Sequence, residues 1–81
     1  MFIESAVEER WINSDQVLYF EIVKSTEFDP EKPGDPYECW FLVAHMRNGR
    51  TIRMESAGDP ETIEDMMRSY QDQIEDYEQR R

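Results

Sequence analysis

Alternation of apolar and polar residues predicts two strands in the central part of the chain. Segment 17–25 is rich in β-branched and aromatic residues, and the charged Glu21 marks the solvent side of its alternation. Segment 38–47 has a similar composition and is expected to form the second strand. In the first strand, the residues expected to face the core are Leu18, Phe20 and Ile22.

The dipeptide Asn48-Gly49 predicts a hairpin that joins segment 38–47 to a further strand over 50–56. Asn-Gly is typical of a two-residue type I′ turn, in which both central residues need a positive φ. A two-residue loop would place Arg47 opposite Arg50 and would fix the register of both strands. On this register, the core-facing residues of the hairpin are Phe41, Val43, Ile52 and Met54.

A helix is predicted over residues 60–78. Asp59 has the side chain of an N-cap, Pro60 suits the first helical position, and Glu61 lies near the positive end of the helix dipole. Apolar residues then recur at helical spacing and predict one stripe that covers the sheet. The stripe consists of Ile63, Met66, Met67, Tyr70, Ile74 and Tyr77.

The two remaining segments are less regular. Residues 2–12 mix apolar and acidic side chains, which predicts an edge strand that bends or breaks near Glu8-Glu9. Residues 26–37 contain Pro30, Pro33 and Pro36 and are expected to form an extended loop, because proline cannot donate to a strand ladder. The predicted fold is a single α+β domain, 1–81, with three to four antiparallel strands packed by one C-terminal helix.

Charge narrows the classes of partner. The chain carries 19 acidic and 9 basic residues, a net charge of −10, which repels nucleic acid and anionic membranes and attracts basic protein surfaces. Met1–Arg10 has the character of neither a signal peptide nor a membrane span. The lone Cys39 cannot form an internal disulfide, and a cytoplasmic location is expected.

Candidate catalytic chemistry is sparse. The one histidine, His45, is expected opposite Ile52 with Arg47 and Arg50 beyond it, where a metal ligand or general base would need carboxylate or histidine partners. The chain has no CxxC pair, no glycine-rich phosphate loop and no GxSxG motif. We therefore expect a non-catalytic protein that holds neither a metal nor a cofactor.

One candidate surface is the sheet face that the helix would leave open. On the predicted register this face is apolar, with aromatic, methionine and arginine side chains that are typical of interface centres. Two alternatives remain open. Either the N-terminal segment folds over this face with Trp11 and Ile12, or a partner or a second copy covers it. The predicted contact residues are Tyr19, Trp40, Leu42, Met46 and Arg53, flanked by Val23 and Ala44.

The second candidate surface is the helix itself. Residues 59–78 contain eight acidic side chains and one basic side chain, a net charge of −7. Carboxylates along a rigid helix can imitate phosphates and occupy a basic nucleic-acid channel of another protein, although such a helix can also serve only to keep a thin-cored protein soluble. The predicted contact residues are Glu61, Glu64, Asp65, Asp72, Glu75 and Asp76.

Two resemblances bear on function. Asn13-Ser14-Asp15, the strand to Glu21, Asn48-Gly49-Arg50, Met54-Glu55-Ser56 and a closing helix together resemble the layout of short flagellar FlbD-type proteins. In size and charge, the chain is similar to small acidic phage inhibitors of the anti-CRISPR and DNA-mimic kinds. The second resemblance implies an inhibitor that docks on a basic partner protein. The first implies a motility or structural accessory protein that self-associates as a homodimer through the open sheet face.

Overall fold

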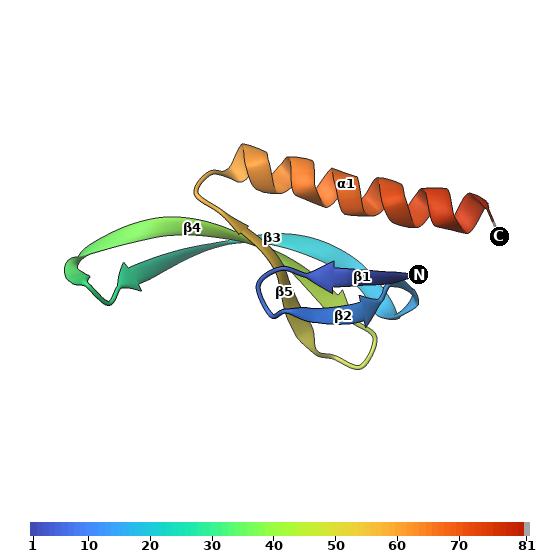
Figure 1. Ribbon diagram of the computed structural model, residues 1–81, viewed down its shortest axis with the longest axis horizontal. Helices are drawn as coiled ribbons and strands as arrows, with labels where there is room; N and C mark the ends of the chain where they lie inside the picture. The colour runs from blue at the N-terminus through green and yellow to red at the C-terminus, as the bar shows by residue number, and fades with distance from the viewer. Residues whose placement is uncertain (81) are drawn as a thin grey trace.

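The computed structural model has an α+β fold, as the sequence predicts, and describes residues 1–80 apart from the side chain of Pro33. Arg81 lies outside the described residues. Strands β3, β4 and β5 form a three-stranded antiparallel sheet, β1 and β2 form a separate antiparallel pair, and α1 lies along one side of the sheet (Figure 1). The bounds are β1 Phe2–Ser5, β2 Arg10–Asn13, a 3-10 turn Ser14–Gln16, β3 Val17–Asp29, β4 Lys32–Met46, β5 Thr51–Ala57 and α1 Pro60–Gln79.

Segment 26–37, predicted as an extended loop, is instead a β-ribbon. Thr26 pairs with Glu38 and Phe28 with Pro36, so β3 and β4 continue as a two-stranded arm that projects from the rest of the molecule (Figure 1). The last partner of β4 on β5 is Ala57, opposite Trp40. Beyond that point one edge of β4 has no neighbouring strand. Proline is tolerated in such an edge strand, because its missing N–H costs no hydrogen bond to a neighbour. The molecule is consequently elongated, 51 × 25 × 18 Å.

The β4–β5 hairpin closes with three loop residues rather than the predicted two. The N–H of Met46 donates to the carbonyl oxygen of Arg50 (2.8 Å), and Gly49 lies between them with a φ of +86°. Ala44 therefore pairs with Ile52, one residue out of the predicted register. Because side chains alternate along a strand, this shift turns the β4 side chains next to the loop to the opposite face. A second register shift, between Leu42 and Val43, brings Phe41 opposite its predicted partner Ser56, and the faces of β4 stay reversed beyond it.

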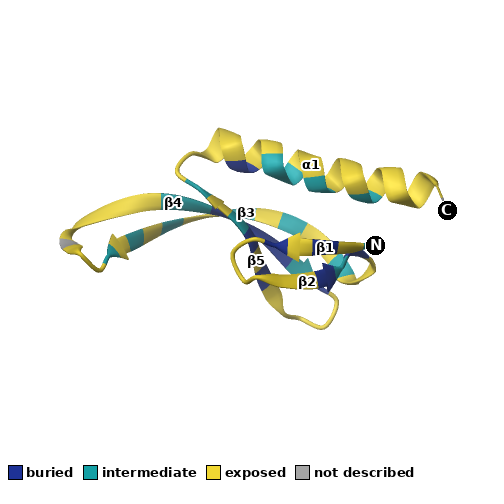
Figure 2. Ribbon diagram, viewed as in Figure 1, coloured by how far each residue is buried: buried dark blue, intermediate teal, exposed yellow. Residues whose placement is uncertain are grey.

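The predicted orientation of β4 is therefore wrong. Trp40, Leu42 and Met46 face α1 and belong to the core, whereas Phe41 and Val43 lie on the other face of the sheet. Leu18 was also expected in the core but is 55% exposed, because a bulge between Val17 and Tyr19 interrupts the alternation. Burial concentrates where α1, the sheet and the N-terminal pair meet (Figure 2). The core residues are Ile3, Ile12, Leu42, Ala44, Met46, Ile52, Met54 and Ile63.

The N-terminal segment breaks near the predicted position and forms a β-hairpin of two short strands, not an edge strand of the main sheet. It reverses at 6–9, where Glu9 has a φ of +52°, and its inner face contributes Ile3 and Ile12 to the core. This hairpin packs on the core that α1 also covers, so it does not lie over the opposite sheet face. Trp11, which was expected to cover that face if the segment folded back, is 64% exposed.

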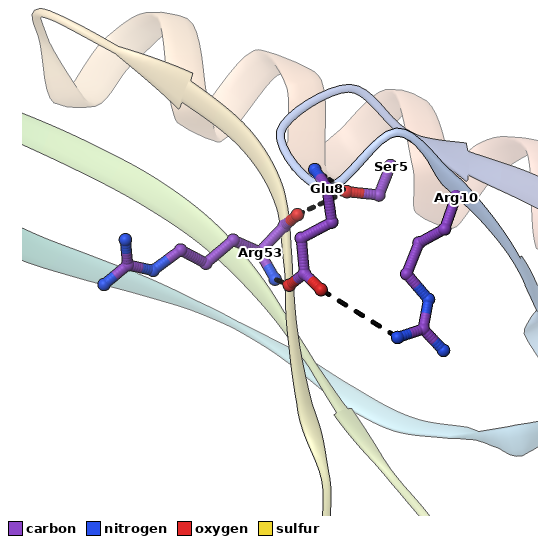
Figure 3. A network of polar contacts seen from close by, with 4 residues as sticks. All are labelled: Ser5, Glu8, Arg10 and Arg53. Carbon is purple, nitrogen blue, oxygen red and sulfur yellow. Dashed lines mark hydrogen bonds and ion pairs between the residues drawn. The ribbon is translucent and has the colours of Figure 1, made fainter.

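Polar contacts tie this hairpin to the outer edge of β5 (Figure 3). The Ser5 hydroxyl donates to the carbonyl oxygen of Arg53, and the Glu8 carboxylate accepts the Arg53 N–H at 2.7 Å. Arg10 lies 3.9 Å from the same carboxylate, and Ala6 N–H donates to the Met54 carbonyl oxygen at 2.9 Å. An exposed strand edge can pair with other chains, and these contacts close part of the β5 edge.

Candidate interaction surfaces

The local sequence determines where α1 begins and which side of it faces solvent. Asp59 caps the helix by accepting the Thr62 N–H at 2.8 Å, and this contact, followed by one with the Thr62 hydroxyl, holds the pKa of Asp59 below its ordinary value. Pro60 begins the helix, and Ile63 in its first turn is fully buried. Met66, Met67, Tyr70 and Ile74 continue the packed side, so the acidic positions between them must face solvent.

All six predicted acidic contact residues of the helix are exposed. Arg68 lies 3.6 Å from Asp65 and Arg80 lies 3.2 Å from Asp76, so two of the six carboxylates are partly neutralised by the helix's own arginines. The other four have no basic side chain within ion-pair distance among residues 1–80. We call these four the acidic stripe: Glu61, Glu64, Asp72 and Glu75.

The arm carries a second concentration of acid. Residues 24–38 contain five acidic and two basic side chains, a net charge of −3. One of the two cations, Lys24, pairs with Glu38 at 2.9 Å and lies 5.5 Å from the ring centroid of Trp40. The arm and the C-terminal end of α1 point in opposite directions along the molecule (Figure 1). Both ends of the protein therefore present negative charge.

The sheet face opposite α1 keeps only part of the predicted contact set. Tyr19 and Arg53 lie on it and are exposed, whereas Leu42 is 0% and Met46 7% exposed within the core on the other side. Trp40 is half-buried on the core side as well. Phe41 and Val43 lie on the outer face in place of these three, but both are buried, with 8% and 9% of the residue exposed.

Polar side chains partly cover this outer face. The Arg53 guanidinium lies 4.3 Å from the ring centroid of Phe41, which shields the ring from solvent. His45 stacks on Tyr19 with ring centroids 4.3 Å apart, and its Nε2 lies 3.3 Å from Glu21 Oε1. The histidine therefore has a carboxylate neighbour, not the arginine neighbours expected from the sequence, and it lies opposite Thr51 rather than Ile52.

A groove between β1 and α1 was missed by the sequence analysis. It has a volume of about 400 Å³ and is flanked by Phe2 and Trp11, which are 66% and 64% exposed. The sequence signal that could have predicted it is the alternation in residues 2–4 and 11–13, where Ile3 and Ile12 face inward and their neighbours face outward. Without a recognisable turn signal at Val7-Glu8-Glu9, the two segments could not be paired in advance.

Inside the groove, Tyr70 links the two elements. Its hydroxyl lies 2.6 Å from Glu55 Oε1 and 3.2 Å from the carbonyl oxygen of Glu4. Burial, then the hydrogen bond to Glu55, and then the charges of Glu55 and Glu4 raise the pKa of the phenol above its ordinary value. The carboxylates of Glu4 and Glu55, which both line the groove, place negative charge at its floor.

Two searches for other features were negative within the part of the chain that the structure describes. Residues 1–80 contain no group of three or more histidine, cysteine, aspartate or glutamate side chains placed to hold a metal ion. Over the same residues, no helix is both long and apolar enough to cross a membrane. Comparisons with protein families, curated proteins and solved structures find no match to this chain.

Proposed function

We propose that this chain is a non-catalytic binding protein, a small acidic inhibitor or regulator that docks on a basic, nucleic-acid-binding surface of a partner protein. The observation that supports this most is the acidic stripe. Its four carboxylates are exposed, lie on one rigid helix and have no basic neighbour among residues 1–80. Unneutralised charge of this kind attracts a basic surface over the range of a Debye length.

The dimensions of α1 suit this role. A helix of 20 residues is about 30 Å long, close to the axial length of about nine base pairs. Its carboxylates can therefore occupy a channel built for a short nucleic-acid segment, which is how inhibitors of the anti-CRISPR and DNA-mimic kinds would act. The net charge of −10 disfavours direct binding of nucleic acid. A cytoplasmic site of action is part of the proposal, on the evidence of a single unpaired cysteine.

The proposal is tested by affinity capture with three forms of the chain. One is the wild type, one has Glu64, Asp72 and Glu75 changed to Lys, and one has Glu27, Glu31 and Asp35 of the arm changed to Lys. The two variants have the same net charge. We expect a basic protein to be retained by the wild type and the arm variant and lost by the helix variant. Equal loss from both variants would show that overall charge, not the helix, governs binding.

A second candidate function is self-association through the outer sheet face, as in an FlbD-like accessory protein. Charge balance favours it, because this face carries both Glu21 and Arg53, and a two-fold axis could bring opposite charges together. Sedimentation velocity distinguishes the two functions. A homodimer that persists at high salt and is lost in Val23→Asp, at an exposed position paired with Phe41, favours self-association. A monomer at all concentrations rejects it.

A further inference from the structure

We propose that the groove between β1 and α1 binds an arginine or lysine side chain of the partner protein. The inference deepens the proposed function and rests on it: the acidic stripe would attract a basic surface from a distance, and the groove would capture one of its cations at contact. The proposal is carried by exposed aromatic side chains and unneutralised carboxylates in one concave site.

The aromatic side chains come from the N-terminal hairpin. Glu4 pairs directly with Trp11, and Phe2 lies diagonally beside Trp11 on the same face. Both rings contribute little to the core, because about two thirds of each is exposed. Two aromatic rings exposed side by side are typical of an interaction site. Aromatic faces attract arginine and lysine, whose apolar stems also pack against the rings.

The carboxylates supply the charge that selects a cation. Glu4 and Glu55 both line the groove, and neither has a lysine, arginine or histidine within ion-pair distance among the described residues. Glu55 is half-buried and already accepts the Tyr70 hydroxyl, which fixes the position of its carboxylate. A guanidinium or ammonium group would pair with these oxygens without displacing a cation of the protein itself.

The helix side of the groove is uncharged. The positions of α1 that line it are Met66, Ser69, Tyr70 and Gln73, in contrast to the carboxylates on the solvent side of the same helix. The site therefore combines apolar walls, polar neutral groups and a negative floor, and none of its lining residues is basic. That combination matches one long side chain with a charged end, rather than an anion or a wholly apolar group.

The test uses N-acetyl-arginine amide as the probe and its neutral analogue N-acetyl-citrulline amide as the control. Binding is followed by the NMR shift of the Trp11 indole N–H. We expect a saturable shift with the arginine probe and none that saturates with citrulline. Trp11→Ala and Glu4→Gln should each weaken the affinity about two- to fivefold, read from the remaining groove resonances. Glu31→Gln, which removes the same charge from an exposed position on the arm, should leave it unchanged.

Three results would overturn the inference: no saturable shift, an equal shift with citrulline, or an equal loss in Glu31→Gln and Glu4→Gln. Each is distinguishable from failure of the proposed function, which is judged by capture of a basic protein through the acidic stripe. Both groove variants alter exposed side chains. Retention of the wild-type pattern of backbone amide shifts outside the groove would show that they fold.

Discussion

The N–H of Met46 donates a hydrogen bond of 2.8 Å to the carbonyl oxygen of Arg50 and closes a loop whose third residue, Gly49, has a φ of +86°. Gly49 would have room for a methyl group, since nothing lies within 4 Å of a Cβ built there. Any cost of adding one must therefore come from the backbone.

Gly49→Ala should destabilise the protein by about 1–2 kcal/mol, because an L-residue resists the left-handed conformation. Gly58→Ala is the matched control, since Gly58 has equal space and no positive φ. It should be neutral or slightly stabilising. Urea denaturation of both variants gives the comparison. Equal stabilities would mean that the loop does not have the conformation described.

Substitutions at two leucines test which side chains of β3 and β4 face the core. Leu42→Ala should cost about 3 kcal/mol, because the side chain is 0% exposed and its removal leaves a cavity between the sheet and α1. Leu18→Ala should change the free energy of unfolding by less than about 0.5 kcal/mol, because Leu18 is 55% exposed at a bulge. The opposite ranking in thermal denaturation would restore the register with a two-residue loop.

Tyr70 should make the free energy of unfolding decrease at alkaline pH. Its phenol has a raised pKa when folded, so the folded state binds that proton more tightly than the unfolded chain does. The resulting stability is complete below the ordinary tyrosine pKa of about 10 and is lost as the pH rises through the folded pKa. Tyr70→Phe should cost about 1 kcal/mol at neutral pH through the lost hydrogen bond to Glu55.

The pH dependence distinguishes this role from simple packing. Above about pH 10 the difference in the free energy of unfolding between wild type and Tyr70→Phe should narrow, because only the wild type loses the stabilisation by the protonated phenol. Tyr37→Phe, at an exposed position on the arm, serves as the control and should follow the wild type. A gap that stays constant across this pH range would assign the effect to packing alone.

The contacts at the β5 edge predict the exchange rate of one amide. Glu8→Ala removes the acceptor of the Arg53 N–H, and we expect the hydrogen exchange of the Arg53 amide to accelerate roughly tenfold. Glu8→Gln keeps an acceptor oxygen and should retain most of the protection. If all three forms exchange alike, the N-terminal hairpin does not close this edge in solution.

Elements with a local signal could be predicted from the sequence. Asp59-Pro60 marks the start of α1, and the spacing from Ile63 to Ile74 identifies its packed side, so the exposed acidic stripe follows from local pattern alone. The register of β4 could not be predicted in the same way. Asn48-Gly49 suits both a two-residue loop and a three-residue loop with glycine in the left-handed region, and the choice decides which face of the sheet the neighbouring side chains of β4 occupy.

Features that depend on distant segments were also missed. The arm needs a free edge on β4, and that edge exists only because β5 has no partner for β4 beyond Ala57. The groove needs Tyr70 to meet the carbonyl oxygen of Glu4, which is 66 residues earlier in the chain. No local pattern predicts either arrangement, because the arm depends on where the pairing of β5 with β4 ends and the groove depends on how the N-terminal hairpin and α1 pack on the same core.

The most direct test of the proposed function is the rate at which the chain associates with its captured partner, measured over a range of ionic strengths. For the wild type and the arm variant, we predict a fast rate that falls steeply as salt is added, because charge on α1 steers the encounter. The variant with lysine at Glu64, Asp72 and Glu75 should associate slowly, with little dependence on salt. Identical salt dependence in all three forms would contradict the claim that the acidic stripe recognises the partner.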